Sequence, residues 1–256
     1  WGDYIADVWD KWLVDPSGQL LVAVIDGVPA GIVHVAWLNP NTAWLEGMRV
    51  NPDFRRHGVA NALDQRAIAT ARERGCKIAR LATSVKNIAA QSLLEAGNYR
   101  RAARFNEWQA EPLRGDFSNL RVATGKDIDP ILARWNRSEI RAASHSIVPN
   151  RHWRWTAIDR ARLHEQIHRN EVRVSSNGFA LLPTFDEGDW NGLSIHALGG
   201  DAEEIFSLAL AVRGEAEHRG YAHIEAMAAD HAPLNTALER AGFKTESGMF
   251  LYEHDL

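Results

Sequence analysis

The chain has 256 residues and a formal net charge of -4 at pH 7, and 45% of its residues are hydrophobic. This composition is typical of a soluble globular protein with one large domain or two ordinary ones. The lack of a basic excess argues against a nucleic-acid partner. No apolar run approaches the roughly 20 residues of a membrane-spanning helix, so no membrane partner is expected. The single cysteine, Cys76, excludes an internal disulfide and favours a cytoplasmic location.

The first elements that the sequence predicts are a helix and a hairpin. Apolar residues recur at helical spacing from Gly2 to Leu13, and the segment 15–18, which contains Pro and Gly, ends this helix. The β-rich runs 21–25 and 31–37 follow on either side of Asp26-Gly27. Two such runs around an Asp-Gly turn predict a β-hairpin.

A strand, a loop and a helix are predicted next, within residues 44–66. The apolar run that ends at Val50 predicts the strand, and helical spacing resumes at Val59 after an Asn-Pro-Asp break. Gly58 in the loop has no Cβ, and a helix start leaves its first N–H groups unpaired. Together with two arginines, these amides predict a site for a phosphate or pyrophosphate. An ordinary solvated helix start is the alternative.

Three further elements complete this half of the chain. The helix continues over residues 60–74 and ends at Gly75. Residues 78–82 predict a strand, and residues 87–96 predict a short helix that Gly97 closes.

Two motifs and the order of these elements resemble the GNAT acetyltransferase superfamily. The pattern Arg-x-x-Gly-x-Ala from Arg55 to Ala60 is similar to the superfamily's acyl-CoA pyrophosphate loop. Asn87, followed by Leu93 and Gly97, is similar to its second signature, in which Asn contacts the pantetheine arm. The resemblance implies acetyl-CoA as the co-substrate. The residues implied to bind it are Met48, Arg49, Val50, Arg55, Arg56, His57, Gly58, Val59, Ala60 and Asn87.

The same resemblance implies direct transfer of an acetyl group to a primary amine of a small molecule or peptide. The strand 48–50 would splay from its neighbour, eased by Gly47, and its amides would polarise the thioester carbonyl. Glu46 stands close to where many members keep a glutamate that accepts the amine proton, so we expect it to be the catalytic base. An exposed edge carboxylate, or a partner for Arg49, is the alternative for Glu46.

The superfamily's usual general acid is missing. It is commonly a Tyr seven residues after the Asn, and Leu94 occupies that position. His34, His57 and Tyr99 are the substitutes to consider, and a core or pocket role is the alternative for His34. Nucleophilic catalysis through Cys76 is not expected, because no histidine pattern pairs with it. The missing Tyr also motivates a second hypothesis, a non-catalytic CoA-binding or sensor module.

The second half of the chain repeats features of the first. Arg74-Gly75 matches Arg219-Gly220, and Gly97 matches Gly242 at the same offset. We therefore expect an α/β (α+β) protein of two tandem GNAT folds, each a mixed, mostly antiparallel central sheet flanked by helices, similar to tandem members such as mycothiol synthase. The expected parts are 1–110 for the N-terminal GNAT domain, 111–118 for a linker and 119–256 for a degenerate C-terminal domain.

The second copy differs from the first at its start and at its loop. It opens with a β segment near Leu120 and a helical pattern over 127–141, whose counterparts in the first copy would lie before Trp1. We expect about two dozen preceding residues, so that the first copy lacks its initial strand and helix. Residues 200–205 replace the cationic loop with three carboxylates, which repel a pyrophosphate. We expect a structural half that helps shape the acceptor pocket, in a monomeric pseudo-dimer or a homodimer.

A rival motif is His164-Glu165-Gln166-Ile167-His168, which matches the zinc-binding His-Glu-x-x-His pattern of peptidases. Three arginines within 160–169 crowd this motif, and no third ligand is identifiable. Thr156 and Asp159 predict a capping box at the start of a solvated amphipathic helix. We expect no metal here, and a zinc peptidase is the remote alternative.

The segment Arg151-His152-Trp153-Arg154-Trp155 mixes cations with aromatic residues. Such a mixture occurs in patches that bind nucleic acids. Because the net charge is acidic, we expect buried tryptophans beneath snorkelling arginines instead.

Overall fold

The computed structural model describes residues 4–115, 119–150, 153–183 and 191–256. These residues divide into two compact units. The first unit comprises Trp1–Thr83, Asn87–Ala102 and Leu251–Leu256, and the second comprises Ser84–Lys86 and Ala103–Phe250. The first unit therefore includes the C-terminal end of the chain.

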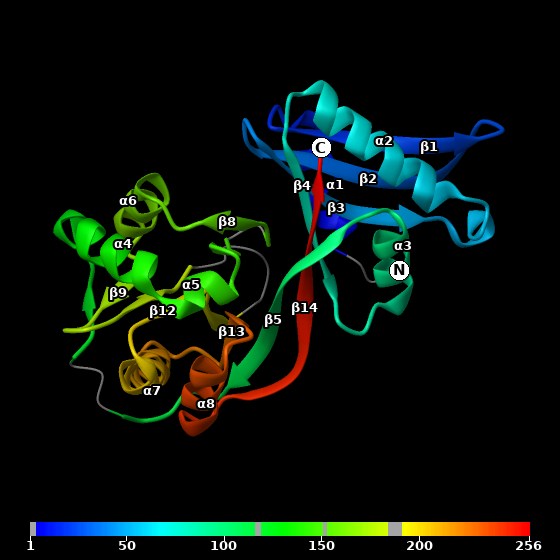
Figure 1. The fold of residues 1–256 in the computed structure, drawn as a ribbon. Helices are drawn as coiled ribbons and strands as arrows, with labels where there is room; N and C mark the ends of the chain where they lie inside the picture. Colours follow the sequence, from blue (N-terminus) through cyan, green and yellow to red (C-terminus); the bar gives the residue numbers. More distant parts are fainter. Residues whose placement is uncertain (1–3, 116–118, 151–152, 184–190) are drawn as a thin grey trace. The chain divides into compact units, whose positions relative to one another are not determined.

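The first unit contains a sheet that begins with a hairpin (Figure 1). Its strand order is β1-β2-β3-β4-β14, in which β4 runs parallel to β3 and the first three strands are antiparallel. Only the last residues of β14 belong to this unit. The elements are α1 (Ile5–Val14), β1 (Gly18–Ile25), β2 (Val28–Asn39), β3 (Thr42–Val50), η1 (Pro52–Phe54), α2 (Val59–Glu73), β4 (Ile78–Ser84), α3 (Ile88–Ala96) and β14 (Lys244–Asp255).

The hairpin of β1 and β2 forms as the sequence predicts. Ile25 pairs with Val28 around Asp26 and Gly27, whose φ angles are 49° and 83°. Two successive positive φ angles are the geometry of a type I′ turn, whose twist matches that of the flanking strands. The Asp-Gly pair therefore fixes the register of the hairpin.

Helix α2 packs across β1, β2 and β3 (Figure 1). Its buried residues include Leu63, Ala67 and Ala71, which recur at intervals of one helical turn. Gly31 in β2 permits the close approach, because a Cβ there would lie 2.7 Å from the carbonyl oxygen of Arg49 and 3.0 Å from Leu63. The helix start is thereby held directly beyond the end of β3.

The C-terminal residues are anchored in the first unit by buried polar contacts. Glu253 is fully buried and forms ion pairs of 2.5 Å with Arg80 and with Arg100. The amide of Leu256 donates to the carbonyl of Lys77. Removing one partner of a buried ion pair is strongly destabilising, so these contacts fix the final strand.

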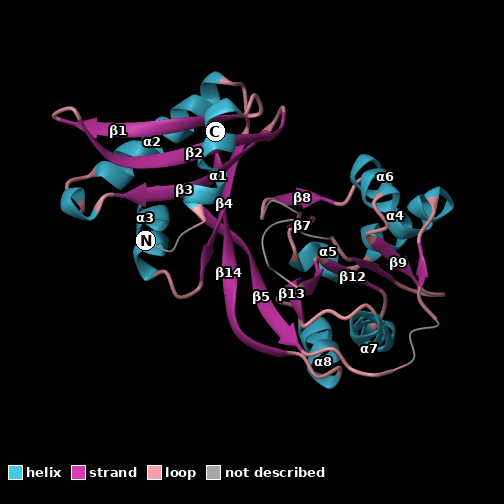
Figure 2. Cartoon of the chain, turned by 180° about the vertical axis from the view of Figure 1, so that it is seen from behind, coloured by secondary structure: helices cyan, strands magenta, loops and turns pink. Residues whose placement is uncertain are grey.

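The second unit contains three separate strand groups, five α-helices and one 3-10 helix among the described residues (Figure 2). The strand orders are β14-β5-β13-β11, in which β14 contributes its residues before Leu251, β12-β10-β9-β6 and β7-β8. Its core is built on fully buried aromatic residues, among them Trp108, Trp135 and Trp155. The elements are β5 (Arg100–Ala110), β6 (Arg121–Val122), η2 (Gly125–Asp127), α4 (Ile128–Arg137), α5 (Glu139–Ala143), β7 (Ile147–Pro149), β8 (Trp155–Ala157), α6 (Arg160–His168), β9 (Val172–Val174), β10 (Phe179–Leu181), β11 (Gly192–Ile195), β12 (Ala197–Gly199), α7 (Ala202–His218), β13 (His223–Ala229) and α8 (Ala232–Arg240).

The predicted fold class is confirmed, since the chain is a mixed α/β protein with a mostly antiparallel sheet flanked by helices. The single helix expected over 127–141 is wrong, because Ser138 is extended and separates α4 from α5. The Ser138 hydroxyl accepts a hydrogen bond from the amide of Ile140 and so begins the second helix. The division into 1–110, 111–118 and 119–256 stays a prediction, and residues 116–118 of that linker lie outside the described residues.

Candidate active site

The expected splay in the first sheet lies between β3 and β4. These strands pair only where Thr42, Ala43 and Trp44 face residues 78–80. Beyond Trp44, β3 continues to pair with β2 on its other side, and Gly47 has a φ of 67° opposite a register shift. The later amides of β3 therefore lie outside the ladder with β4, which is the arrangement expected of a strand that holds a ligand's amide groups.

The loop after β3 ends at a helix start that lacks an internal cap. Gly58 is the N-cap of α2, with φ 78° and ψ 3°, and no side chain caps the helix. The first turn of α2 contains no acidic residue. Because the first amides of a helix have no intrahelical partner, this end carries partial positive charge directed outward.

The residues around Gly58 fit a bound diphosphate. A Cβ built on Gly58 would meet no protein atom within 4 Å, so the space beside its backbone is open. Arg55, Arg56 and His57 are exposed on the same loop. Val59 is buried, so its side chain is not available to a ligand. Exposed guanidiniums beside unfilled helix amides match the chemistry of a pyrophosphate.

Glu46 lies inside the sheet, paired with a histidine. Its carboxylate Oε1 is 2.9 Å from Nδ1 of His34, the residue directly opposite on β2. The side chain of Glu46 is 13% exposed and that of His34 is 0% exposed. Glu46 is therefore not the exposed edge carboxylate that the sequence left open. The core role for His34 is the one that the structure supports.

The other expected substitutes for the missing Tyr differ in their surroundings. Leu94 is buried, with 4% exposure. The Tyr99 hydroxyl donates to Oδ1 of Asp64 at 2.8 Å, and burial together with the Asp64 charge raises the pKa of Tyr99 far above its ordinary value. Tyr99 therefore holds its proton in a structural bond. His57 is the one of the three substitutes that lies exposed, on the loop next to Gly58.

Two further residues have local roles that the structure defines. The Oδ1 atom of Asn87 accepts a hydrogen bond of 3.1 Å from the amide of Ala90 and caps α3. Cys76 is buried, and burial raises the pKa of its thiol. A buried thiol of raised pKa is a poor nucleophile, consistent with the expectation that Cys76 takes no part in catalysis.

The corresponding helix start in the second unit is capped by its own carboxylate. Asp201 accepts a hydrogen bond of 2.9 Å from the amide of Glu204, and Glu203 and Glu204 occupy the first turn of α7. Glu203 also pairs with Arg240. This arrangement satisfies the helix start internally, so the ordinary role expected for these carboxylates is the observed one.

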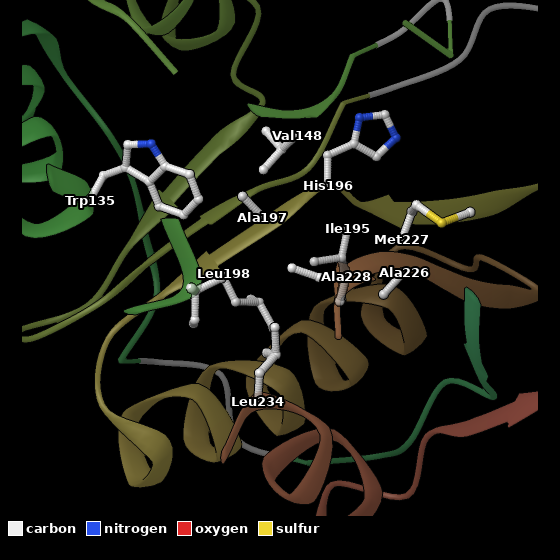
Figure 3. Close-up of a pocket in the computed structure, with 12 residues that line it drawn as sticks. Trp135, Val148, Ile195, His196, Ala197, Leu198, Ala226, Met227, Ala228 and Leu234 are labelled. Carbon is white, nitrogen blue, oxygen red and sulfur yellow. The ribbon is translucent and has the colours of Figure 1, made fainter. Parts of the chain in front are cut away.

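Described residues of the second unit line two hollows that bear on function. One mixes charges of both signs from Arg134, Arg137, Glu139 and Asp201 at the starts of α7 and α8. The other is a narrow, mostly apolar hollow beside His196 (Figure 3). Burial, followed by the charge of Arg162, lowers the pKa of His196 to about 3, so this imidazole is neutral.

The rival zinc motif lies on α6 with both histidines, His164 and His168, exposed. No group of three or more His, Cys, Asp or Glu side chains in the described ranges is arranged to hold a metal ion. The predicted capping box is wrong at both residues, because Thr156 lies in β8 and Asp159 is itself the N-cap of α6, accepting a hydrogen bond from the amide of Arg162. The Arg162 side chain is not solvated, since it donates to backbone carbonyls that include that of Pro149.

The aromatic segment before α6 is described from Trp153 onward, and residues 151–152 lie outside the described residues. Trp155 is buried, with 1% exposure, whereas Trp153 is 45% exposed. The prediction of buried tryptophans is therefore right for Trp155 and wrong for Trp153. Separately, none of the described helices has the length and apolar character that crossing a membrane requires.

Comparisons with known proteins show similarity in the first part of the chain and in the overall fold. Residues 1–97 match the family model described as acetyltransferase (GNAT) family. A GCN5-related N-acetyltransferase from Sphaerobacter thermophilus has a TM-score of 0.68 at 17% identity, covering 98% of this chain and 85% of that one. A tandem GNAT protein from the clavulanic acid biosynthesis pathway has a TM-score of 0.60 at 14% identity, covering 94% and 84%. At such identities these likenesses show the fold alone.

The comparison with curated protein sequences gives no match. The family match covers the stretch that contains the splayed strand, the open loop and the start of α2. Residues 1–97 of this chain therefore resemble the GNAT acetyltransferase family.

Proposed function

We propose that this protein is an acetyl-CoA-dependent N-acetyltransferase that transfers an acetyl group directly to a primary amine of a small molecule or peptide. The observation that carries the proposal is the uncapped, acid-free start of α2 beside the exposed cations Arg55 and Arg56. It lies within the stretch that matches the GNAT family. We place the reaction in the cytoplasm, because the only cysteine is a free buried thiol.

The residues that would hold acetyl-CoA lie on three segments of the first unit. The amides that follow Gly58, with Arg55, Arg56 and His57, would bind the diphosphate. The main chain of Met48, Arg49 and Val50 would receive the pantetheine arm and polarise the thioester carbonyl. Asn87 would meet the same arm, as its place in the second GNAT-like motif implies.

Glu46 would act as the general base. An amine that is protonated at neutral pH must lose a proton before it attacks the thioester. The amine nitrogen then forms a bond to the acetyl carbon as the carbon–sulfur bond breaks, and the leaving thiolate takes up a proton. A thiol has an ordinary pKa of about 8.5, so departure without a dedicated acid is feasible. Because His57 would bind the diphosphate, at the other end of the pantetheine arm from the sulfur, water would supply this proton.

The experiment combines thiol release from acetyl-CoA across a panel of amines with calorimetric binding of acetyl-CoA. Gly58→Ala should weaken binding on the order of a hundredfold, because the added methyl occupies the open space beside the amides. Gly75→Ala is the matched control. Gly75 follows the same helix at its other end, with φ 90° and nothing within 4 Å of a built Cβ, so it carries similar backbone strain. Equal affinity in the two variants would contradict the proposed site.

A non-catalytic CoA-binding or sensor module is the second candidate. The observation that favours it is the buried Leu94 at the position of the usual acid, together with the Tyr99 hydroxyl committed to Asp64. Binding of acetyl-CoA without thiol release on any amine would select this candidate. Thiol release that Glu46→Gln lowers by at least about a hundredfold would select the enzyme.

A further inference from the structure

A cluster of residues joins α1, β1, β2 and β3 of the first unit. We name it the His34 cluster, and its members are Trp12, Gly18, His34, Glu46 and Gly47. All of them lie within the first compact unit. Glu46 is the base of the proposed reaction, and the other four residues of the cluster have no chemical step in it.

The hydrogen bond between His34 and Glu46 has a defined direction. Nδ1 of His34 and Oε1 of Glu46 are 2.9 Å apart. A general base must be an ionised carboxylate, which can only accept, so with Glu46 as the base Nδ1 of His34 carries the hydrogen and donates it. The two residues are direct cross-strand neighbours, so the backbone register itself brings them together. A hydrogen bond to a charged carboxylate is stronger than one between neutral groups, and it fixes the direction of the carboxylate.

The imidazole is itself held on two sides. The Trp12 ring stacks on it with centroids 4.6 Å apart and planes 3° from parallel. At its other end, a Cβ on Gly18 would lie 2.4 Å from Nε2 of His34. The imidazole therefore fills its space closely against β1, and any larger residue at position 18 would displace it.

Trp12 is likewise seated against a glycine. A Cβ on Gly47 would lie 2.3 Å from the Trp12 ring. Gly47 also carries the positive φ beside the register shift of β3. Gly47 thus permits the bend in β3 and also makes room for the Trp12 ring. That ring stacks on His34, which lies opposite Glu46, the residue next to Gly47.

We propose that His34 is a positioning residue for the reaction, which holds the Glu46 carboxylate in the orientation that accepts the amine proton. This inference rests on the proposed function, because Glu46 must be the base for its orientation to matter. Trp12 and Gly18 keep the imidazole in place, and His34 does not touch the substrate. The small exposed part of Glu46, at 13%, is the surface that meets the amine.

The test separates positioning from simple core filling with two variants of His34. His34→Leu removes the donor, and His34→Asn keeps an N–H near the position of Nδ1. We expect His34→Leu to lower kcat on the order of tenfold to a hundredfold, because small misplacements of a reacting group have effects of this size. The KM for acetyl-CoA should stay unchanged, and His34→Asn should recover most of the kcat.

Gly18→Ala provides an independent test that removes no atom. Its methyl would press on Nε2 and turn the imidazole, so kcat should fall as in His34→Leu. Gly125→Ala is the matched control, because a built Cβ there meets nothing within 4 Å. If His34→Leu does not fold, as judged by its melting curve, Gly18→Ala carries the test.

An NMR measurement that needs no acetyl-CoA tests the hydrogen bond between His34 and Glu46 directly. Nitrogen-15 spectra of the histidine rings report which ring nitrogen carries the hydrogen, and the His34 signals are identified by their loss in His34→Asn. We expect the Nδ1–H form in the wild type and a shift of these signals in Glu46→Gln. The opposite form, or no shift, would overturn the inference.

The kinetic outcomes distinguish the two proposals. Full activity in Glu46→Gln, or no turnover on any amine, contradicts the proposed function and removes the basis of this inference. A large loss in Glu46→Gln with an unchanged kcat in His34→Leu overturns the positioning role alone. Equal losses in His34→Leu and His34→Asn also overturn it, since the restored donor should then have helped.

Discussion

The starts of α2 and α7 are the same kind of element with opposite electrostatics. Helix α2 begins after Gly58 with no side-chain cap and no acid in its first turn. Helix α7 begins after Asp201, whose carboxylate caps it, and carries two glutamates in its first turn. One helix end is left for an outside anion, and the other is satisfied from within the chain. A helix start therefore indicates a ligand site only when the chain leaves it unfilled.

The two units also differ in their fully buried histidines. His34 of the first unit donates to the carboxylate of Glu46. His196 of the second unit lies beside an apolar hollow near the positive charge of Arg162, which lowers its pKa further than burial alone. The first histidine is arranged to orient a reactive group. The second is a neutral component of the core.

The largest expected effect comes from making the first helix start resemble the second. The double variant Arg55→Glu with Arg56→Glu places carboxylates beside the amides that follow Gly58. Loss of two charge-assisted contacts and the added repulsion should weaken acetyl-CoA binding on the order of a hundredfold to a thousandfold. Calorimetry at two salt concentrations measures this. The control, Arg134→Glu with Arg137→Glu on α4, should leave the affinity as in the wild type.

The next effect is a loss of stability at acidic pH that is caused by His196. Between pH 6.5 and about 3 the unfolded chain binds a proton at this histidine and the folded chain does not. The free energy of unfolding should therefore fall by up to about 1.4 kcal/mol for each pH unit as the pH decreases through this window. Urea unfolding of wild type and His196→Leu at pH 7 and pH 5 measures the difference. An identical acid dependence in both proteins would contradict the neutral state assigned to His196.

A smaller effect is expected from the cap of α7. Asp201→Ala leaves the amide of Glu204 without its side-chain acceptor and should cost about 1 kcal/mol of stability. It should not create or remove acetyl-CoA binding, because the remaining glutamates still occupy the first turn. Thermal melting and calorimetry test the two parts. A gain of coenzyme binding in this variant would show that the second helix start is only masked.

The smallest effect is expected at Asp64, which accepts the Tyr99 hydrogen bond within the first unit. Burial raises the pKa of Asp64 above its ordinary value of 3.8. The stability that this group contributes is therefore present at low pH and lost as the pH rises through the folded-state value. Asp64→Asn keeps an acceptor for Tyr99 and should gain, relative to wild type, less than about 1 kcal/mol between pH 4 and pH 7. A constant difference over this range would contradict the raised pKa.

Local sequence signals predicted the parts of the fold that depend on neighbours in the chain. The Asp26-Gly27 turn and the strand before the loop follow from residue type and spacing. The break at Ser138 was missed, because helical periodicity runs through it and only the local hydrogen bond to Ile140 interrupts the helix. Helix propensity alone does not decide between a continuous helix and a break at a capping serine.

Contacts between segments that are distant in the chain could not be predicted from the sequence. The buried pairing of Glu253 with Arg80 joins residues that are far apart in the chain, and no local pattern marks it. The pair of His34 and Glu46 is different, because a hairpin register places residues of β2 and β3 opposite each other. However, the register shift between Trp37 and Asn39 places Glu46, and not Gly47, opposite His34, so the spacing at the turn alone would not have paired them. The stacking of Trp12 depends on how α1 packs and could not have been predicted in this way.

The most direct measurement is a crystal structure of the protein with acetyl-CoA. We expect density for the diphosphate against the main-chain amides that follow Gly58, with the guanidiniums of Arg55 and Arg56 turned toward it. Density at the start of α7, or a complex in which the Gly58 loop contacts no ligand, would contradict this expectation.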